Sequence, residues 1–165
     1  MAAGSTYTPI ATNTLGSATT ALSFNSISGS YTDLVLIMNI KGTGTGWGKI
    51  TFNSDTGTNY SQTELRGNGT TASSGRGTNQ TGIQPIGAAL FTTAFGFNNI
   101  VNIMNYSNTT TYKTVLARGN NANNGTDAEA CLWRSTAAIT SITITASANQ
   151  FDTGSSFTLY GIAAA

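Results

Sequence analysis

Histidine is missing from this sequence of 165 residues, and only one cysteine, Cys131, is present. Without histidine, the chain cannot build a Ser-His or Cys-His nucleophile pair, nor the usual zinc-ligand sets. A single cysteine cannot form a disulfide within the chain. We therefore expect no catalytic site, no cofactor site and no metal site, and the protein is predicted not to be an enzyme.

Charge is scarce as well. Charged residues make up 8% of the chain, with seven basic and six acidic side chains. The basic residues are scattered singly from Lys41 to Arg134, so no basic stripe could follow a phosphate backbone. No apolar run approaches the roughly 20 residues of a transmembrane helix. Residues 1–7 lack the basic and apolar regions of a secretory signal. We expect neither a nucleic acid nor a membrane partner, and synthesis in a host cytoplasm.

Thr, Ser, Asn and Gly make up about half of the chain. Threonine favours strands and covers their outer faces, while glycine and asparagine favour the turns between them. Short apolar stretches recur about every ten to fifteen residues, a spacing typical of sandwiches. The sequence predicts a single all-β domain, an antiparallel two-sheet β-sandwich of jelly-roll-like form with 8–10 strands. An extended N-terminal arm, residues 1–15, is expected to precede the sandwich at 16–165 and to pack on a neighbouring subunit or on the shell of a particle.

Ten stretches have strand character, namely 21–27, 31–40, 47–53, 59–66, 83–91, 97–106, 112–118, 127–135, 139–146 and 156–162. Two polar, glycine-rich segments, 67–82 and 119–126, are predicted to be exposed loops. The stretch 31–40 is apolar on both faces, so it is expected to be buried on both sides for part of its length. Together with apolar residues in 86–97, it predicts a homo-oligomer, with a trimer favoured.

Two Asp-Thr-Gly sequences, at Asp55 and Asp152, resemble the active-site motif of pepsin-like aspartic proteases. Such an enzyme needs two carboxylates that face each other and share a proton. Asp55 is surrounded by polar residues, and only thirteen residues follow Asp152. We therefore interpret both motifs as turns between strands.

Two other patterns invite a chemical interpretation. Residues 42–49 look like a phosphate-binding loop, but Thr43 stands where the first glycine of the GxxxxGK[ST] template must be and Ile50 follows Lys49. Asp127 and Glu129 share a strand face and could serve a glycosidase. We expect instead a flexible loop at 42–49 and two solvated carboxylates on an outer face.

Aromatic residues could form a platform for a sugar ring or a partner. Trp47 borders the glycine-rich loop and Trp133 lies near a strand end, with Tyr60, Tyr106 and Tyr112 also available. The alternative is that these rings fill the core or a subunit interface, as aromatic residues in β-sandwiches do. Trp47, Tyr60 and Trp133 are therefore candidate contacts for a glycan or a partner, with the core as the competing interpretation.

Residues 24–40 (FNSISGSYTDLVLIMNI) and 156–162 (SFTLYGI) resemble small β-sandwich proteins of tailed bacteriophages. Members with this Thr/Asn/Gly-rich composition serve as capsid decoration (cement) proteins or as fibre and receptor-binding tips. The resemblance implies a location in the virion and, commonly, a homotrimer. It transfers no functional residues to this chain.

The leading hypothesis is therefore a non-enzymatic structural protein, a phage capsid decoration protein that binds and stabilises the shell. Its partners would be copies of itself and the major capsid protein or another virion protein. The alternative is a receptor- or carbohydrate-binding module at a fibre or tail tip. No shaft of repeats and no coiled coil is visible in the sequence, so we favour decoration.

Overall fold

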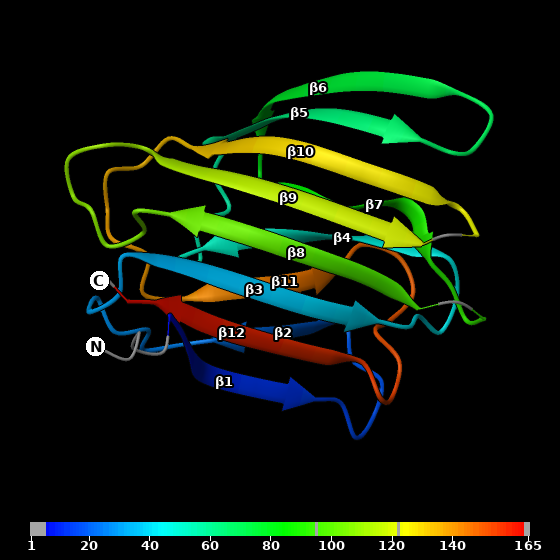
Figure 1. The fold of residues 1–165 in the computed structure, drawn as a ribbon, viewed down its shortest axis with the longest axis horizontal. Coiled ribbons are helices and arrows are strands. Elements are labelled where there is room, and N and C mark those ends of the chain that lie inside the picture. The colour runs from blue at the N-terminus through cyan, green and yellow to red at the C-terminus, as the bar shows by residue number, and fades with distance from the viewer. Residues whose placement is uncertain (1–5, 95, 122, 164–165) are drawn as a thin grey trace.

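Twelve strands make up the fold in the computed structural model, which describes residues 6–94, 96–121 and 123–163, without the side chains of residues 86–90. The strands are β1 (Tyr7–Thr14), β2 (Ala21–Phe24), β3 (Asp33–Ile40), β4 (Gly46–Phe52), β5 (Tyr60–Gly67), β6 (Ala72–Gln80), β7 (Ile83–Phe91), β8 (Phe97–Met104), β9 (Lys113–Asn121), β10 (Gly125–Trp133), β11 (Ile142–Ala146) and β12 (Ser156–Ile162). They form an eight-stranded sheet in the order β1-β12-β3-β8-β9-β10-β5-β6 and a four-stranded sheet in the order β2-β11-β4-β7 (Figure 1).

The strand pairing follows a nested pattern. The outermost pair in the chain is β1 with β12, followed inward by β2 with β11, β3 with β8 and β4 with β7, all antiparallel. Successive pairs alternate between the two sheets. A chain folded back on itself as one long hairpin and rolled into two sheets gives this pattern, which is the jelly roll. The predicted all-β, two-sheet fold of jelly-roll form is confirmed.

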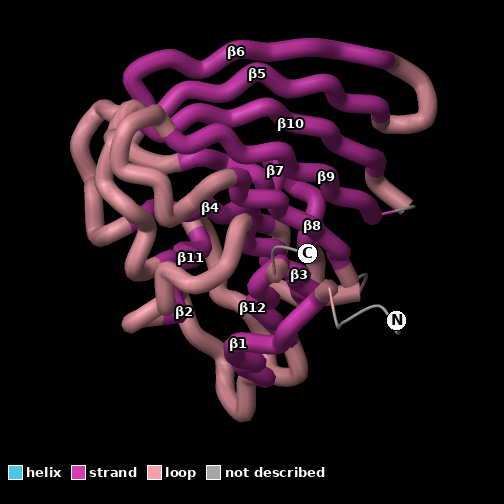
Figure 2. The backbone as a smooth tube through the Cα atoms, turned by 60° about the vertical axis from the view of Figure 1, so that its left-hand side comes forward, coloured by secondary structure: helices cyan, strands magenta, loops and turns pink. Residues whose placement is uncertain are grey.

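Two hairpins are added to these eight strands. β5 and β6 lie between β4 and β7 in the chain, and β9 and β10 lie between β8 and β11. Both hairpins join the larger sheet, which therefore extends beyond the smaller one. Figure 2 shows β5 and β6 at the top of the molecule, past the edge strand β7 of the smaller sheet.

The core lies between the two sheets and is rich in aromatic rings. Tyr60 and Trp133 stack with their ring centroids 6.2 Å apart, and Phe52 lies 5.5 Å from Trp133. A second group joins Phe151 to Phe91 and Phe157. Each large aromatic side chain buries about 150–250 Å² of its surface. These six rings therefore supply much of the apolar surface that is buried between the two sheets.

The strand β3 confirms the prediction of two-sided burial in part. Leu34, Leu36 and Met38 are fully buried between the sheets, as the alternating pattern predicts. On the other face, Val35 is also buried, whereas Ile37 is 39% exposed. The apolar residues predicted at 86–97 fall partly on residues 86–90 and 95, which lie outside the described side chains.

Two segments that were predicted to be exposed loops belong to the larger sheet. The segment 67–82 is not a loop, because Ala72–Gln80 forms β6, paired with β5 from Tyr60 to Gly67. The segment 119–126 is a hairpin, since β9 continues to Asn121 and β10 begins at Gly125. Backbone hydrogen bonds to a neighbouring strand hold both segments in place although their side chains are small and polar.

The N-terminal arm also differs from the prediction. Residues 7–14 form β1, an edge strand paired with β12 of the same chain, rather than an arm that reaches a neighbour. The following Leu15 is buried, and its backbone exchanges hydrogen bonds with Gly154 and Ser155. Residues 1–5 of the predicted arm lie outside the described residues. Across the described ranges no helix has the length and apolarity needed to cross a membrane.

Candidate functional site

A depression of about 550 Å³ lies on the outer face of the eight-stranded sheet, over β9, β10 and β5. Strand register places Leu65 opposite Ala128 and Leu116 opposite Ala130. Leu65 is 64% exposed and Leu116 is 47% exposed. The two alanines stand on the strand between the leucines, so their small side chains leave a hollow with apolar walls.

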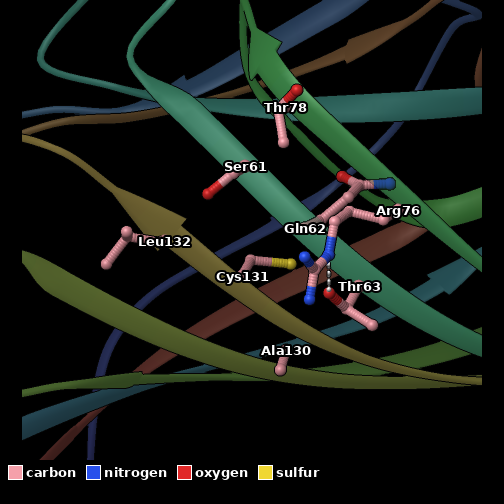
Figure 3. Close-up of a pocket in the computed structure, with 8 residues that line it drawn as sticks. All are labelled: Ser61, Gln62, Thr63, Arg76, Thr78, Ala130, Cys131 and Leu132. Carbon is pink, nitrogen blue, oxygen red and sulfur yellow. Dashed lines mark hydrogen bonds between the residues drawn. The ribbon is translucent and has the colours of Figure 1, made fainter.

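A second hollow, of about 320 Å³, continues over β10, β5 and β6 and shares Thr63 and Ala130 with the first. Figure 3 shows Arg76 of β6 beside Thr63, with a hydrogen bond of 3.4 Å from its Nε to the threonine Oγ1. Ser61 and Thr78 add hydroxyl groups around it. An apolar centre with a polar, arginine-bearing rim is the composition typical of protein-binding surfaces.

The two faces of this part of the sheet differ in charge. Pairing of β5 with β10 and β6 puts Glu64, Asp127 and Glu129 on the inner face, because these positions alternate with the exposed leucine and alanines. On β8, β9, β10, β5 and β6, all of which the structure describes in full, the charged residues of the outer face are Arg76 and Arg118. The outer face is therefore positively charged around an apolar centre.

The prediction that Asp127 and Glu129 are solvated on an outer face is wrong. Both are buried, with 2% and 4% of their surface exposed. Arg66 on β5 lies opposite Asp127 and donates from its Nε to Oδ1 at 3.0 Å; its second contact is Glu64, with Oε2 at 3.2 Å. The alternation of a strand shows that Asp127 and Glu129 lie on the same face of β10. That face is the inner one, because Cys131 and Trp133 continue the same alternation into the core.

Among the residues that the structure describes, no ion pair involves Glu129, although the charge of Arg66 partly opposes the shift of its pKa. Burial, reinforced by the charges of Asp127 and Glu64, raises the pKa of Glu129 to about 8. Burial also raises the pKa of Asp127, although Arg66 opposes that shift. Within the described residues, Oδ2 of Asp127 and Oε1 of Glu129 have no hydrogen-bond partner. A carboxyl with such a pKa is largely protonated at neutral pH, so Glu129 is held as a neutral acid under the sheet.

Cys131 lies next to Glu129 on the same face of β10, with Sγ 3.8 Å from Oε2. It is a free, buried thiol. Burial, with Glu129 and Glu64 adding negative charge, raises its pKa far above the usual range. A thiol kept protonated in this way is not a nucleophile.

The two Asp-Thr-Gly motifs lie at opposite ends of the β4–β11 pair. Asp55 follows Phe52, which pairs with Ile142 at the start of β11. Asp152 follows the other end of β11, and its backbone N–H donates to Lys41 O, before β4 begins. A strand pair of several residues, at about 3.3 Å per residue, separates them, so these two carboxylates form no dyad.

The glycine-rich segment 42–49 also has a structural explanation. A Cβ atom added to Gly42 or Gly46 would lie 2.5 Å from the ring of Phe91, which is fully buried. Glycine is therefore required where this segment passes over Phe91. The expectation of a flexible inter-strand loop holds only for part of 42–49, since β4 begins at Gly46.

The three aromatic candidates are separated by the fold. Tyr60 and Trp133 are 0% and 2% exposed, so their ring faces are not open to a sugar. The Tyr60 hydroxyl accepts from Phe52 N–H and donates to Asp55 O, each at 3.0 Å, and burial raises its pKa to about 12. Trp47 is half-buried and lines a polar groove with residues of β5, β6 and β7.

Apart from Trp47, the residues that form the two solvent-facing sites were not identified from the sequence. Leu65 and Leu116 occur in strands where apolar residues were assigned to the core, and the polar groove uses side chains of β6, which was predicted to be a loop. The alternation of exposed and inward residues in 60–67 is the signal that could have located Leu65. Within the described ranges, no group of three or more Cys, Asp or Glu side chains is placed to hold a metal ion.

Comparison of the chain with protein-family models, with curated proteins and with solved structures finds no match.

Proposed function

We propose that this protein is a non-enzymatic structural protein of a virus particle, a capsid decoration protein that attaches to the shell through the outer face of its larger sheet. The observation that carries the proposal is the hollow between Leu65 and Leu116, apolar at its centre and bordered by Arg76 and Arg118. Exposed apolar patches of this kind on a soluble domain indicate a protein partner.

The charge of this face favours a partner other than a second copy in the same orientation. Two copies packed symmetrically through it would bring the arginines of both together, which costs free energy when they are desolvated. A shell protein with acidic residues around an apolar projection would complement it. The resemblance of residues 24–40 and 156–162 to phage virion proteins supports such a shell as the partner.

Self-association, with a trimer favoured, would use another part of the same sheet. On β3 and β8, Ile37 lies directly opposite Ile100, and Met104 ends the same face of β8. Ile37 and Met104 are 39% and 38% exposed. These side chains lie on strands without an outer-face arginine, so a neighbouring copy could cover them without bringing arginines together.

The test is the protein's copy number and position in purified virions, measured by quantitative mass spectrometry and by labelling in electron microscopy. Hundreds of copies on the shell are expected. A few dozen copies at most on the tail would favour the alternative, a receptor- or carbohydrate-binding tip, and absence from the particle would overturn both.

A variant pair tests the attachment face itself. Leu65→Ser with Leu116→Ser should abolish binding to shells that lack the protein, in a co-sedimentation assay. Tyr112→Ser removes a side chain that is 54% exposed, lies before β9 and lines neither hollow, so it serves as the matched control. Equal binding by both variants would exclude the outer face as the attachment surface.

A further inference from the structure

The larger sheet ends in a strand whose outer edge is open. β6 is the last strand in the order of this sheet, lies past the edge of the smaller sheet (Figure 2), and pairs only with β5 among the described residues. None of its nine residues is buried. The backbone N–H and C=O groups that point outward along such an edge form a template on which another strand can pair.

The other three edges of the two sheets are protected against such pairing. β1 contains Pro9 with a register shift beside it, β2 has only four residues, and β7 contains Pro85. Proline, irregular pairing and short length are devices by which natural proteins protect an edge strand. β6 contains no proline, and its one charged side chain is Arg76. It is therefore the least protected of the four edges.

The regular part of this edge runs from residue 72 to residue 78. The register with β5 shifts only near the end of β6, between the partners of Tyr60 and Gln62, where Asn79 has a φ of 54°. Apart from Arg76, the residues from 72 to 78 are alanine, serine, glycine and threonine. With so little side-chain surface, the strand offers a partner mainly its backbone groups and the charge of Arg76.

We infer that a second copy of this chain occupies the edge, with its own β6 antiparallel to the first about a two-fold axis at Gly75. This register pairs 72–78 of both copies and places Arg76 opposite the partner's Ser74, so like charges are not directly opposed. An axis at Arg76 would oppose the two arginines and would include Asn79, whose backbone is not extended. Main-chain hydrogen bonds supply the affinity when a strand is added to a sheet edge, and two-fold contacts between identical patches are the commonest in oligomers.

Pairing of this kind joins the two larger sheets into one continuous sheet. The axis is perpendicular to the sheet, so the outer faces of both copies point in the same direction and the hollows beside Leu65 and Leu116 stay open. β9, β10 and β5 separate β6 from the strands β3 and β8 that carry Ile37 and Met104, so the two contacts do not overlap. The inference goes beyond attachment to a shell and does not rest on it.

The test uses two substitutions of Ser74, which is exposed on the edge strand. Ser74→Glu places a carboxylate opposite the partner's Arg76, twice in each dimer, so the dissociation constant should fall about fivefold. Ser74→Arg places a positive charge there and should raise the dissociation constant by about the same factor. Sedimentation equilibrium of the purified proteins over a range of concentrations measures both. Asn13→Glu and Asn13→Arg change an exposed residue of the protected edge strand β1, so these matched controls should associate as the wild type does.

Cysteine cross-linking tests the register. Directly opposed residues of antiparallel strands have Cα atoms about 4.5–5.5 Å apart, within reach of a disulfide, whereas diagonal neighbours at about 7–8 Å are too far apart. A mixture of the Ser74→Cys and Arg76→Cys proteins should therefore form a mixed disulfide dimer under mild oxidation, and each protein alone should form far less. The native Cys131 is buried and should not take part. Intact mass separates the mixed dimer from dimers of either variant.

Three results would each overturn the inference: a wild type that stays monomeric or only trimeric at high concentration, a shift of association in the same direction by both Ser74 substitutions, or a cross-link that forms as readily with one cysteine variant alone. If a monomeric wild type loses its binding to shells on Ser74→Arg, the edge pairs with a strand of the shell protein rather than with a second copy. The substitutions of Ser74 and Arg76 change exposed side chains, so these comparisons do not depend on a variant with an altered core.

Discussion

The indole Nε1 of Trp133 donates a 2.7 Å hydrogen bond to Oδ2 of Asp55. The bond joins the end of β10 in the larger sheet to the turn after β4 in the smaller sheet. Asp55 also accepts from Gly57 N–H at 2.8 Å and from Asn59 Nδ2 at 2.9 Å. Burial opposes ionisation of Asp55, but these hydrogen bonds from Trp133, Asn59 and Gly57 hold its pKa below the usual range.

Asp55→Ala should therefore lower the free energy of unfolding by about 2–3 kcal/mol, because it leaves the buried Trp133 N–H without an acceptor. Asp55→Asn keeps one acceptor oxygen and should lose about 1 kcal/mol. Urea denaturation followed by tryptophan fluorescence measures both. Asp152→Ala is the control, since Asp152 pairs with Lys41 in solvent, where ion pairs contribute little. An equal loss from Asp55→Ala and Asp152→Ala would refute the structural role of the Trp133 contact.

The sequence was sufficient for the fold class because that depends on residue types and their spacing. Alternation of apolar residues, as at Leu34, Leu36 and Met38, identifies a half-buried strand wherever it occurs. The strand β6 was not predicted because its inward positions hold Gly75, Gly77 and polar residues, which give no apolar alternation. The pair Asn68-Gly69 was the available indication of a hairpin. Asn68 Oδ1 accepts from Thr70 and Thr71 N–H, and Gly69 has a φ of 88°.

The candidate sites were harder to predict, because periodicity shows which residues share a face but not which face is covered. The inward face of β10 carries Asp127 and Glu129 followed by Cys131 and Trp133. A polar pair on such a strand is normally assigned to solvent. Here the added hairpins extend the larger sheet, and Arg66 on β5 forms an ion pair with the buried Asp127. Neither feature can be predicted from the residues next to Asp127 in the sequence.

The raised pKa of Glu129 predicts an unusual dependence of stability on pH. The folded state binds a proton at Glu129 up to pH about 8, whereas the unfolded chain releases it near the ordinary value of 4.5. Between these values the folded state holds more protons, so the free energy of unfolding falls as pH rises. The slope from this group reaches about 1.4 kcal/mol per pH unit. The neighbouring Asp127 adds a contribution of the same sign, since its pKa is also raised.

Glu129→Gln removes this dependence because glutamine has the shape of the neutral acid. Its free energy of unfolding should vary much less between pH 5 and 8 than that of the wild type, as measured by urea denaturation across that range. Glu64→Gln keeps Glu129 but removes one charge that raises its pKa, so this variant should weaken the pH dependence less than Glu129→Gln does. A wild-type protein whose stability rises over this range would contradict the buried, protonated state of Glu129.

Glycine at position 161 is required by the ring of Tyr31. A Cβ atom at Gly161 would lie 2.3 Å from Cγ of that ring, so Gly161→Ala should lower the unfolding free energy by about 1–3 kcal/mol through overpacking. Gly16 has no neighbouring atom within 4 Å of an added Cβ, so Gly16→Ala is the matched control and should be neutral or slightly stabilising. Thermal unfolding of the two variants measures the difference. Equal melting temperatures would show that Tyr31 moves aside freely.

The edge strand β1 gives the last prediction. Its side chains are mostly exposed, and its register with β12 is interrupted between Pro9 and Ala11. Deletion of residues 1–14 should therefore leave the core in place, and the far-UV β signal should persist.

The deletion also exposes the edge of β12, whose inward residues Phe157 and Leu159 are fully buried. An unpaired edge of this kind recruits strands from other molecules, and proline on an edge strand opposes such pairing. In light scattering, we expect the average mass of the truncated protein to rise with its concentration. Pro9→Thr in the full-length chain should associate less than the truncated protein does, because β1 still covers the edge of β12. Loss of the β signal on truncation would instead show that pairing of β1 with β12 is needed for folding.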